Sequence, residues 1–170
     1  RFVPRDINKA IHYFTLAAKQ NNPAAQHKLG AIFDSGKYVP IDINKAIYYY
    51  TLAVNQMYEK SINNLAMIYY EGKYIKRDIK KAIQYLLLIE NQKNPAILNN
   101  LGFLYISAFD IPHNKEKAIH YFTLAADKNN ITSQHTLGLF YYEGYNVPQD
   151  INKAIYYFTL AANQNISGAQ

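Results

Sequence analysis

The sequence predicts an all-α solenoid, because one helical stretch recurs at a fixed spacing along the chain. The stretch reads Asp-Ile-Asn-Lys-Ala-Ile-Tyr-Tyr-Phe-Thr-Leu-Ala-Ala at residues 150–162, and related copies occupy 6–18, 42–54, 78–89 and 114–126. Its fifth residue is always alanine, and consecutive copies are 36 residues apart. A fixed period of this length is typical of stacked helical repeats, in which each unit packs only against its neighbours.

The recurring stretch is expected to form a helix, which we name the B helix. An acidic or amide side chain opens each copy and can accept a free backbone N–H of the first turn. Apolar residues then follow at i, i+4, i+7 and i+8, which is one face of an α-helix. The expected caps are Asp6, Asp42, Asp78, Asn114 and Asp150. A column of tyrosines is expected to pack in the core: Tyr13, Tyr49, Tyr85, Tyr121 and Tyr157.

A second helix, the A helix, fits between consecutive B helices. Pro23 and Pro95 suit its first turn, where a missing N–H costs nothing. Its leucine column is Leu29, Leu65, Leu101 and Leu137, and the residues that follow are Gly30, Ala66, Gly102 and Gly138. A glycine inside a helix costs about 1 kcal/mol relative to alanine. Its recurrence therefore predicts a point where another backbone comes close, with wider helix spacing at Ala66.

A loop with a recurrent glycine closes each repeat. Gly36, Gly72 and Gly144 are expected to adopt positive φ after the A helix, and Ala108 replaces this glycine in the third copy. The loop at 107–113 should therefore differ from the others. The whole pattern predicts nine helices, five of type B and four of type A. Residues 1–170 would form a single array of about four full repeats plus a leading B helix, truncated at both ends.

Composition and spacing argue against several classes of function. The chain has no cysteine, so disulfides and thiolate metal sites are impossible. The five histidines do not converge with carboxylates at ligand spacing, and no catalytic triad or phosphate-binding loop is visible. We therefore expect no metal, no cofactor and no enzymatic activity. The apolar runs are far too short to span a membrane. The compartment stays open, with the cytoplasm favoured over a secreted or lumenal location.

The net charge of +6 raises the possibility of nucleic-acid binding. One lysine column accounts for much of it: Lys9, Lys45, Lys81, Lys117 and Lys153. These lysines share one repeat position, three residues after the cap. A solvated helix face is the simpler interpretation of such a column.

These motifs resemble the Sel1-like repeat family, which is related to the tetratricopeptide repeat. The A-helix pattern appears as Ala-Gln-His-Lys-Leu-Gly at 25–30, and the B-helix pattern appears as Asp-Ile-Asn-Lys-Ala at 42–46. The departures are Ala66, Ala108 and the leucines at 86–88. The resemblance implies a right-handed superhelix that binds other proteins. It implies adaptor roles in membrane-protein quality control, signalling or bacterial contact with host cells, and no catalytic residues.

By analogy with tetratricopeptide arrays, a concave groove is expected on the A helices. Positions two before, two after and five after the conserved leucine would line it, giving a polar row beside an apolar row. Such rows suit an extended peptide or a helix of a partner. The candidate partner-binding residues are His27, Asn63, Met67, Tyr70, Asn99, Phe103, Ile106, His135, Leu139 and Tyr142. The alternative is that neighbouring helices bury Met67, Phe103 and Leu139.

Three functions follow from this reasoning. The first is a non-enzymatic scaffold or adaptor that binds a protein segment in the groove. The second is a structural segment of a larger assembly, fixed through the B-helix side or the loops. The third is nucleic-acid binding through the basic B-helix face. The sequence does not identify the partner.

Overall fold

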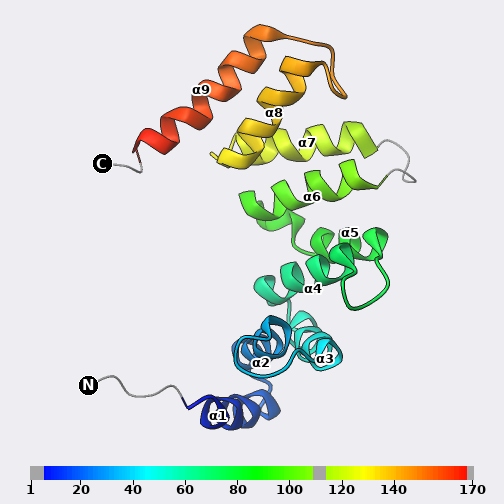
Figure 1. The fold of residues 1–170 in the computed structure, drawn as a ribbon, viewed down its shortest axis with the longest axis vertical. Coiled ribbons are helices and arrows are strands. Elements are labelled where there is room, and N and C mark those ends of the chain that lie inside the picture. Colours follow the sequence, from blue (N-terminus) through cyan, green and yellow to red (C-terminus); the bar gives the residue numbers. More distant parts are fainter. Residues whose placement is uncertain (1–5, 109–113, 168–170) are drawn as a thin grey trace. The chain divides into compact units, whose positions relative to one another are not determined.

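In the computed structural model, the described residues, 6–108 and 114–167, form nine α-helices and no strand (Figure 1). The B helices are α1 (Ile7–Lys19), α3 (Ile43–Val54), α5 (Ile79–Leu87), α7 (Asn114–Ala126) and α9 (Ile151–Ser167). The A helices are α2 (Pro23–Ser35), α4 (Glu59–Glu71), α6 (Pro95–Ser107) and α8 (Ile131–Glu143), and one 3-10 turn spans Glu90–Gln92. The predicted all-α repeat fold is confirmed.

Contacts within the chain divide it into two compact units, Arg1–Ile89 and Glu90–Gln170. The first unit contains α1 to α5, and the second contains the 3-10 turn and α6 to α9. Each unit is described below by itself. A single array over residues 1–170 stays a prediction.

Side-chain caps start most of the B helices, as the sequence predicts. The carboxylates of Asp6, Asp42, Asp78 and Asp150 each accept the backbone N–H of the lysine three residues later, at 2.9–3.1 Å. The prediction fails at Asn114, because α7 begins at this residue and its amide donates to the carbonyl of Ala108 at 2.8 Å. Caps that the sequence analysis missed start three A helices, where Asn22, Asn94 and Asn130 accept a backbone N–H of the first turn.

The predicted loop glycines adopt left-handed conformations. The φ angles are 63° at Gly36, 62° at Gly72 and 71° at Gly144, and each residue ends an A helix. Ala108 ends α6 with φ −99° instead, because an alanine is strained at positive φ. This confirms a departure at the start of the third loop. Residues 109–113 of that loop lie outside the described residues.

The mid-helix glycines face aromatic rings, not the backbone that the sequence analysis expected. A methyl carbon on Gly30 would lie 2.6 Å from the ring of Tyr50, and one on Gly102 would lie 2.7 Å from the ring of Phe122. Gly138 faces Phe158 in the same way. Each ring comes from the following B helix. In the pair formed by α4 and α5, Ala66 stands at the glycine position and Leu86 at the ring position, and both are fully buried. The methyl group of an alanine is thus present where leucine replaces the aromatic ring. The wider spacing predicted at Ala66 stays a prediction.

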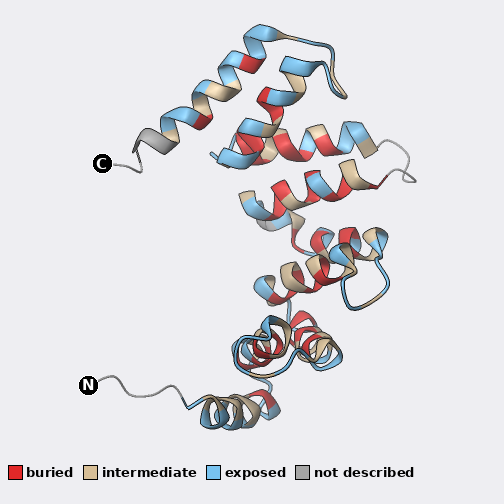
Figure 2. Cartoon of the chain, in the orientation of Figure 1, coloured by how far each residue is buried: buried red, intermediate tan, exposed pale blue. Residues whose placement is uncertain are grey.

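The core of each unit lies where paired helices face one another. Figure 2 shows buried positions along much of α6 and α7, for example. The four A-helix leucines are completely buried, and so are the B-helix alanines Ala46, Ala82 and Ala118. Two buried glutamines also connect neighbouring helix pairs. Gln26 donates to the carbonyl of Ala18 and accepts from Gln56 at 2.8 Å, and Gln134 makes the corresponding bonds to Ala126 and Gln164.

Three of the column lysines, Lys45, Lys117 and Lys153, are exposed, as the sequence analysis favoured. Four members of the column also lie over aromatic rings of A helices. Lys45 Nζ lies 5.2 Å from the ring centre of Phe33, and Lys81 Nζ lies 4.2 Å from that of Tyr69. Lys117 and Lys153 lie over Tyr105 and Tyr141 at 5.2 and 5.0 Å. The same rings stack on the B-helix tyrosines at 5.5–6.0 Å between centres: Tyr49, Tyr85, Tyr121 and Tyr157. A layered lysine–ring–tyrosine contact therefore recurs in each of these pairs.

The tyrosine column is only partly buried. Tyr121 is 7% exposed, and Tyr49, Tyr85 and Tyr157 are half-buried between helices. The prediction of a core residue is wrong for Tyr13, which is 66% exposed. Its stacking partner would have to come from an A helix preceding α1, and none lies in the part of the chain that the structure describes.

Candidate protein-interaction surface

The apolar row predicted on the A helices is accessible in the second unit. Phe103 on α6 and Leu139 on α8 are each 37% exposed, and Tyr142 is 57% exposed. Ile106 is half-buried. Phe103 packs edge-on against Phe122 of α7, with 5.0 Å between ring centres. The core thus supports these side chains, and their outer surfaces face solvent.

The same row in the first unit is more covered. Met67 and Tyr70 on α4 are half-buried, as is Asn63. The guanidinium of Arg77 lies 5.0 Å from the ring centre of Tyr70, and its Nε donates to the Tyr70 carbonyl at 2.9 Å. The alternative, that neighbouring helices bury the row, is therefore wrong for Phe103 and Leu139 and partly right for Met67.

The polar row is largely engaged within the fold. Ser133 Oγ on α8 donates to Asn99 Oδ1 on α6 at 2.8 Å, and Asn99 is only 9% exposed. His27 Nδ1 on α2 lies 3.0 Å from Ser61 Oγ on α4. These contacts connect successive A helices. Asn99 and half-buried His27 therefore support the surface more than they present hydrogen-bonding groups to a partner. His135 is exposed, with its ring 5.6 Å from that of Phe158.

A polar network connects α2, α3 and α4 in the first unit. Tyr50 occupies the position that phenylalanine holds in three other repeats, and its hydroxyl donates to Asp34 Oδ2 at 3.4 Å. Asn64 Nδ2 in turn donates to the Tyr50 oxygen at 2.8 Å. Burial raises the pKa of Asp34, and burial also raises the pKa of Tyr50. Tyr50 is completely buried, so the half-buried Asp34 and Asn64 are the groups of this network that solvent reaches, whereas Phe103, Leu139 and Tyr142 are exposed on α6 and α8.

Acidification should weaken the first unit through His27. Burial lowers the pKa of His27 below its ordinary value of 6.5, and the charges of Lys28 and Lys60 lower it further. The unfolded chain then binds more protons than the folded one between the two pKa values, so the free energy of unfolding falls as pH drops through and below 6.5. Urea unfolding at pH 7.5 and pH 5.5 measures this.

The matched control is His27→Asn, because asparagine occupies this repeat position at Asn99 and binds the serine of the next A helix. The variant should lose the His27 part of the pH dependence and keep the fold. An unchanged pH dependence in His27→Asn contradicts the assignment.

The structure offers no arrangement for metal chemistry in its described residues, where no group of three or more His, Asp or Glu side chains could hold an ion. Within the same residues, no helix is both long and apolar enough to cross a membrane. The absence of enzymatic activity and of cofactors stays a prediction.

The sequence analysis did not identify which residues contact the recurrent mid-helix glycines. The glycine and ring columns are each visible in the sequence, and the ring follows its glycine by 20 residues, as in Gly102 and Phe122. Such a constant offset could have identified the pairing. The pocket between α1 and α2 had no comparable signal, because it is lined by residues of several columns.

The Sel1 repeat pattern matches five segments of the chain: 1–22, 23–56, 60–93, 97–130 and 131–166. Among solved structures, the chain is similar to a Sel1 repeat protein from Oxalobacter formigenes, with 28% identity and a TM-score of 0.78. That alignment covers 95% of this chain and 66% of the other. A search of curated proteins found no match.

Two further structures are similar in fold alone. A protective antigen of uropathogenic Escherichia coli, which displays an SLR fold, has 24% identity and a TM-score of 0.81, covering 91% of this chain and 33% of that one. An immunity protein from Pseudomonas aeruginosa has 20% identity and a TM-score of 0.55, covering 89% and 56%. The chain therefore spans 33% to 66% of the length of the three structures named here.

Proposed function

Because the chain belongs to the Sel1 repeat family, we propose that it is a non-enzymatic scaffold that binds a segment of a partner protein along the exposed face of its A helices. Sel1 repeat proteins generally mediate protein–protein interactions, and the family is typically non-catalytic. The partner would be an extended peptide or a helix. Its ordering on a preformed surface would limit the entropic cost of association.

The observation that carries the proposal is the exposed apolar surface of α6 and α8. Phe103, Leu139 and Tyr142 present it, and the only charged residue in these two helices is Glu143. Large aromatic side chains in well-packed surroundings are frequent anchors of protein interfaces, and apolar neighbours such as Leu139 exclude water around them. A partner segment with apolar side chains at helical or alternate spacing would fit this surface.

The A helices and the B helices differ in the charge that they carry. The four A helices together contain two lysines and four carboxylates, whereas the five B helices contain eight lysines and one carboxylate. A partner on the A-helix side therefore meets a surface without excess positive charge. This favours a protein segment there over a nucleic acid, whose binding depends on phosphate contacts with cationic side chains.

The B-helix lysines favour nucleic-acid binding less than their number indicates. Lys45, Lys81, Lys117 and Lys153 lie over rings, and Lys45 Nζ is also 2.9 Å from the capping Asp42. Lys153 is similarly 3.7 Å from Asp150. Intramolecular contacts therefore offset part of the positive charge of this side. Binding that weakens steeply with salt would support the nucleic-acid alternative instead.

Charge substitutions in the apolar row should remove partner binding. Phe103→Asp and Leu139→Asp each place a carboxylate in the contact surface, so the affinity for a captured protein partner should fall by about tenfold or more. Binding of the purified partner to each variant, followed by calorimetry, measures the effect.

Matched controls are Tyr48→Asp and Tyr156→Asp on the B helices, where the side chains are 59% and 58% exposed. They should leave the affinity unchanged. If the controls abolish binding and the A-helix variants do not, the partner uses the B-helix side, as the structural-segment alternative requires.

A further inference from the structure

Hydrogen-bonded glutamines connect the ends of neighbouring helices in two of the repeats. Gln26 of α2, which is 1% exposed, donates to the carbonyl of Ala18 at 3.3 Å and to Asn21 Oδ1 at 3.4 Å. Its own Oε1 accepts a hydrogen bond from Gln56 Nε2 at 2.8 Å. The bridge thus joins an A helix to the ends of the B helices before and after it. The equivalent bridge on α8 consists of Gln134, Ala126 and Gln164.

The same four repeat positions line a pocket beside α6. Leu98 and Lys128 stand where the two glutamines would be, and Glu90 and Lys93 stand where the alanine and the asparagine would be. Leucine has no hydrogen-bonding group in its side chain, so the bridge cannot form. A cavity of about 320 Å³ lies there instead, within the second unit, and we name it the Leu98 pocket. The rest of its lining is Asn91, Leu124 and Asp127.

The most buried part of this lining is apolar, and one carboxylate is fixed beside it. Leu98 is 1% exposed and Leu124 is half-buried. Glu90 is also half-buried, and its Oε1 accepts a hydrogen bond from the hydroxyl of Tyr121 at 2.8 Å. The other four B helices have alanine or valine at the position of Glu90. The packing of the repeat therefore does not require a carboxylate here.

The Leu98 pocket carries charges of both signs. Lys93, Asp127 and Lys128 are exposed, and no ion pair connects them to each other or to Glu90, all four lying in the part of the chain that the structure describes. A cation bound here would face two ammonium groups, and an anion would face two carboxylates. A zwitterion can place each of its charges beside the opposite one. The lining therefore matches a ligand that has an ammonium, a carboxylate and an apolar group.

We propose that the Leu98 pocket binds a free apolar α-amino acid, such as leucine, as its zwitterion. Its ammonium group would contact Glu90, its carboxylate would contact the lysines, and its side chain would lie against Leu98 and Leu124. The cavity is at the lower end of the range for ligand pockets, about 300–1,000 Å³, which favours a ligand of this size. The inference does not depend on the scaffold function, because none of the lining residues belongs to the exposed A-helix row.

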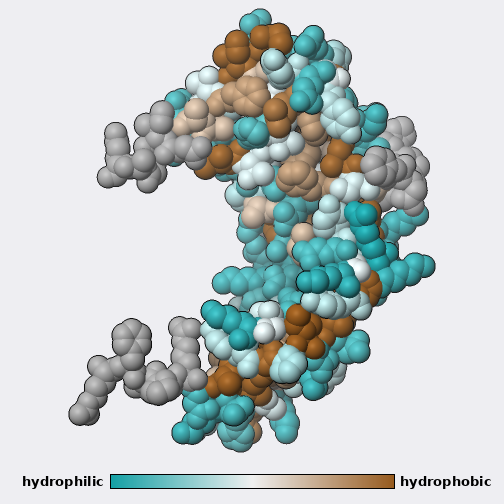
Figure 3. Space-filling model, in the orientation of Figure 1, coloured by the Kyte–Doolittle hydropathy of each residue, from teal (hydrophilic) through white to brown (hydrophobic). Residues whose placement is uncertain are grey.

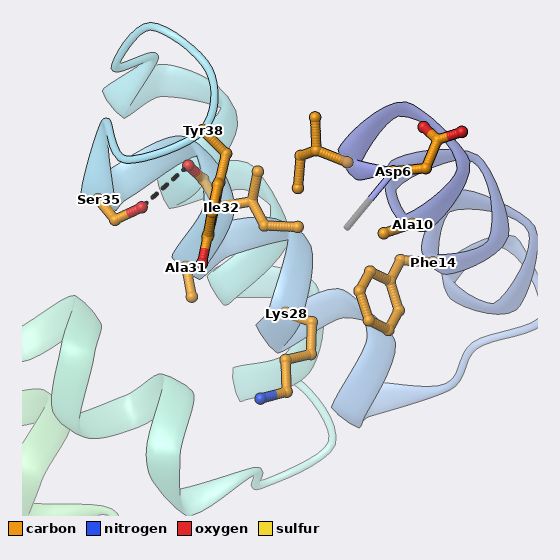
Figure 4. Close-up of a pocket in the computed structure, with 9 residues that line it drawn as sticks. Asp6, Ala10, Phe14, Lys28, Ala31, Ile32, Ser35 and Tyr38 are labelled. Carbon is orange, nitrogen blue, oxygen red and sulfur yellow. Dashed lines mark hydrogen bonds between the residues drawn. The ribbon is translucent and has the colours of Figure 1, made fainter. Parts of the chain in front are cut away.

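The larger pocket between α1 and α2, of about 620 Å³, has a different chemistry. Figure 4 shows Phe14 of α1 and Ile32 of α2 on opposite walls. Figure 3 shows apolar side chains at the surface in the region of α1 to α3. The lining contains one carboxylate and one ammonium group, and the carboxylate, Asp6, already pairs with Lys9 at 3.6 Å. We therefore expect no amino-acid binding there, and its Lys28 provides a control position.

Isothermal titration calorimetry of the 170-residue chain with L-leucine at neutral pH measures binding. Saturable binding at one site per chain is expected. Two leucine analogues, 3-methylbutylamine and 4-methylpentanoate, each lack one of the two charged groups. Each should bind about tenfold or more weakly than leucine, because hydrogen bonds between charged groups are stronger than those between neutral ones.

A matched variant rebuilds the bridge of the other repeats. Leu98→Gln combined with Lys128→Gln places glutamine at both positions, so it should close the pocket and abolish leucine binding. Circular dichroism checks that the helices are kept. The control Lys28→Gln removes a lysine from the pocket between α1 and α2 and should leave leucine binding unchanged.

A single substitution tests the carboxylate without altering the shape of the pocket. Glu90→Gln keeps an oxygen that can accept the hydrogen bond of Tyr121 and removes the charge. Leucine should then bind about tenfold or more weakly, while 4-methylpentanoate should bind no more weakly than before. Phe103→Asp should leave leucine binding unchanged, which separates this site from the proposed partner surface.

Three results would overturn the proposal. They are no saturation up to about 10 mM leucine, binding of either analogue as tight as that of leucine, and full binding by the variant with glutamine at positions 98 and 128. The second would show that the pocket does not recognise both charges. The third would place leucine outside the pocket.

Discussion

Phe122→Ala is expected to lower the free energy of unfolding of the second unit by about 3–5 kcal/mol, the usual cost of removing a buried aromatic ring. Phe122 is completely buried and lies against Gly102, Phe103 and Phe140. Its loss leaves a cavity that rigid helices fill only partly. Urea unfolding followed by far-UV circular dichroism measures the total change.

Because the chain divides into two units, the stability of individual helices is more informative than the total free energy of unfolding. In hydrogen exchange, the amides of α6, α7 and α8 should lose protection in Phe122→Ala, while those of α2 and α4 keep it, because repeats are coupled mainly to their neighbours. The control Tyr48→Ala removes a ring that is 59% exposed and should change stability by less than about 0.5 kcal/mol. A loss below about 1 kcal/mol for Phe122→Ala would show that the ring is not the centre of this core.

Gly102→Ala should destabilise the second unit by about 1–3 kcal/mol, although alanine favours helices by about 1 kcal/mol over glycine. The reason is steric, because the added methyl carbon would lie 2.7 Å from the ring of Phe122. Helix propensity and packing thus predict opposite signs. Urea unfolding of the single variant decides between them, and a stabilised Gly102→Ala would refute the packing account.

The double variant Gly102→Ala with Phe122→Leu reproduces the pair Ala66 and Leu86, which α4 and α5 already contain. Its destabilisation should be smaller than the sum of the two single effects by about 1 kcal/mol or more, since residues in contact couple. Additive effects would show that the glycine and the ring act independently. The control Ala66→Gly removes a methyl group beside a smaller side chain and should cost about 1 kcal/mol.

Much of the fold was predictable because the same residue type recurs at the same position of each repeat, which indicates a shared structural role. A carboxylate at Asp42 and at three equivalent positions predicts a cap, and glycine at Gly36, Gly72 and Gly144 predicts a left-handed turn. Both depend on local backbone chemistry, which sequence shows directly. Asn114 departs from its column through a contact with Ala108, where the loop glycine is absent.

The candidate surface was less predictable, because a column shows that a position is special without showing what it faces. Asn99 looked like a partner-binding group, yet it accepts a hydrogen bond from Ser133 of the next A helix. Gly102 indicated a close approach, and only the three-dimensional arrangement shows that the approaching group is a ring. Phe103 and Leu139 were identified correctly as accessible, because each is 37% exposed although Phe103 also packs against Phe122. Their binding role remains a proposal.

Site-specific photo-crosslinking tests most directly whether the A-helix face holds a partner polypeptide. A benzophenone amino acid would replace Phe103 or Leu139 in turn, with Tyr156 on the B-helix side as the matched control position. The account predicts that one segment of the bound partner crosslinks to positions 103 and 139 and not to position 156. Crosslinks of that partner to position 156 alone would contradict it.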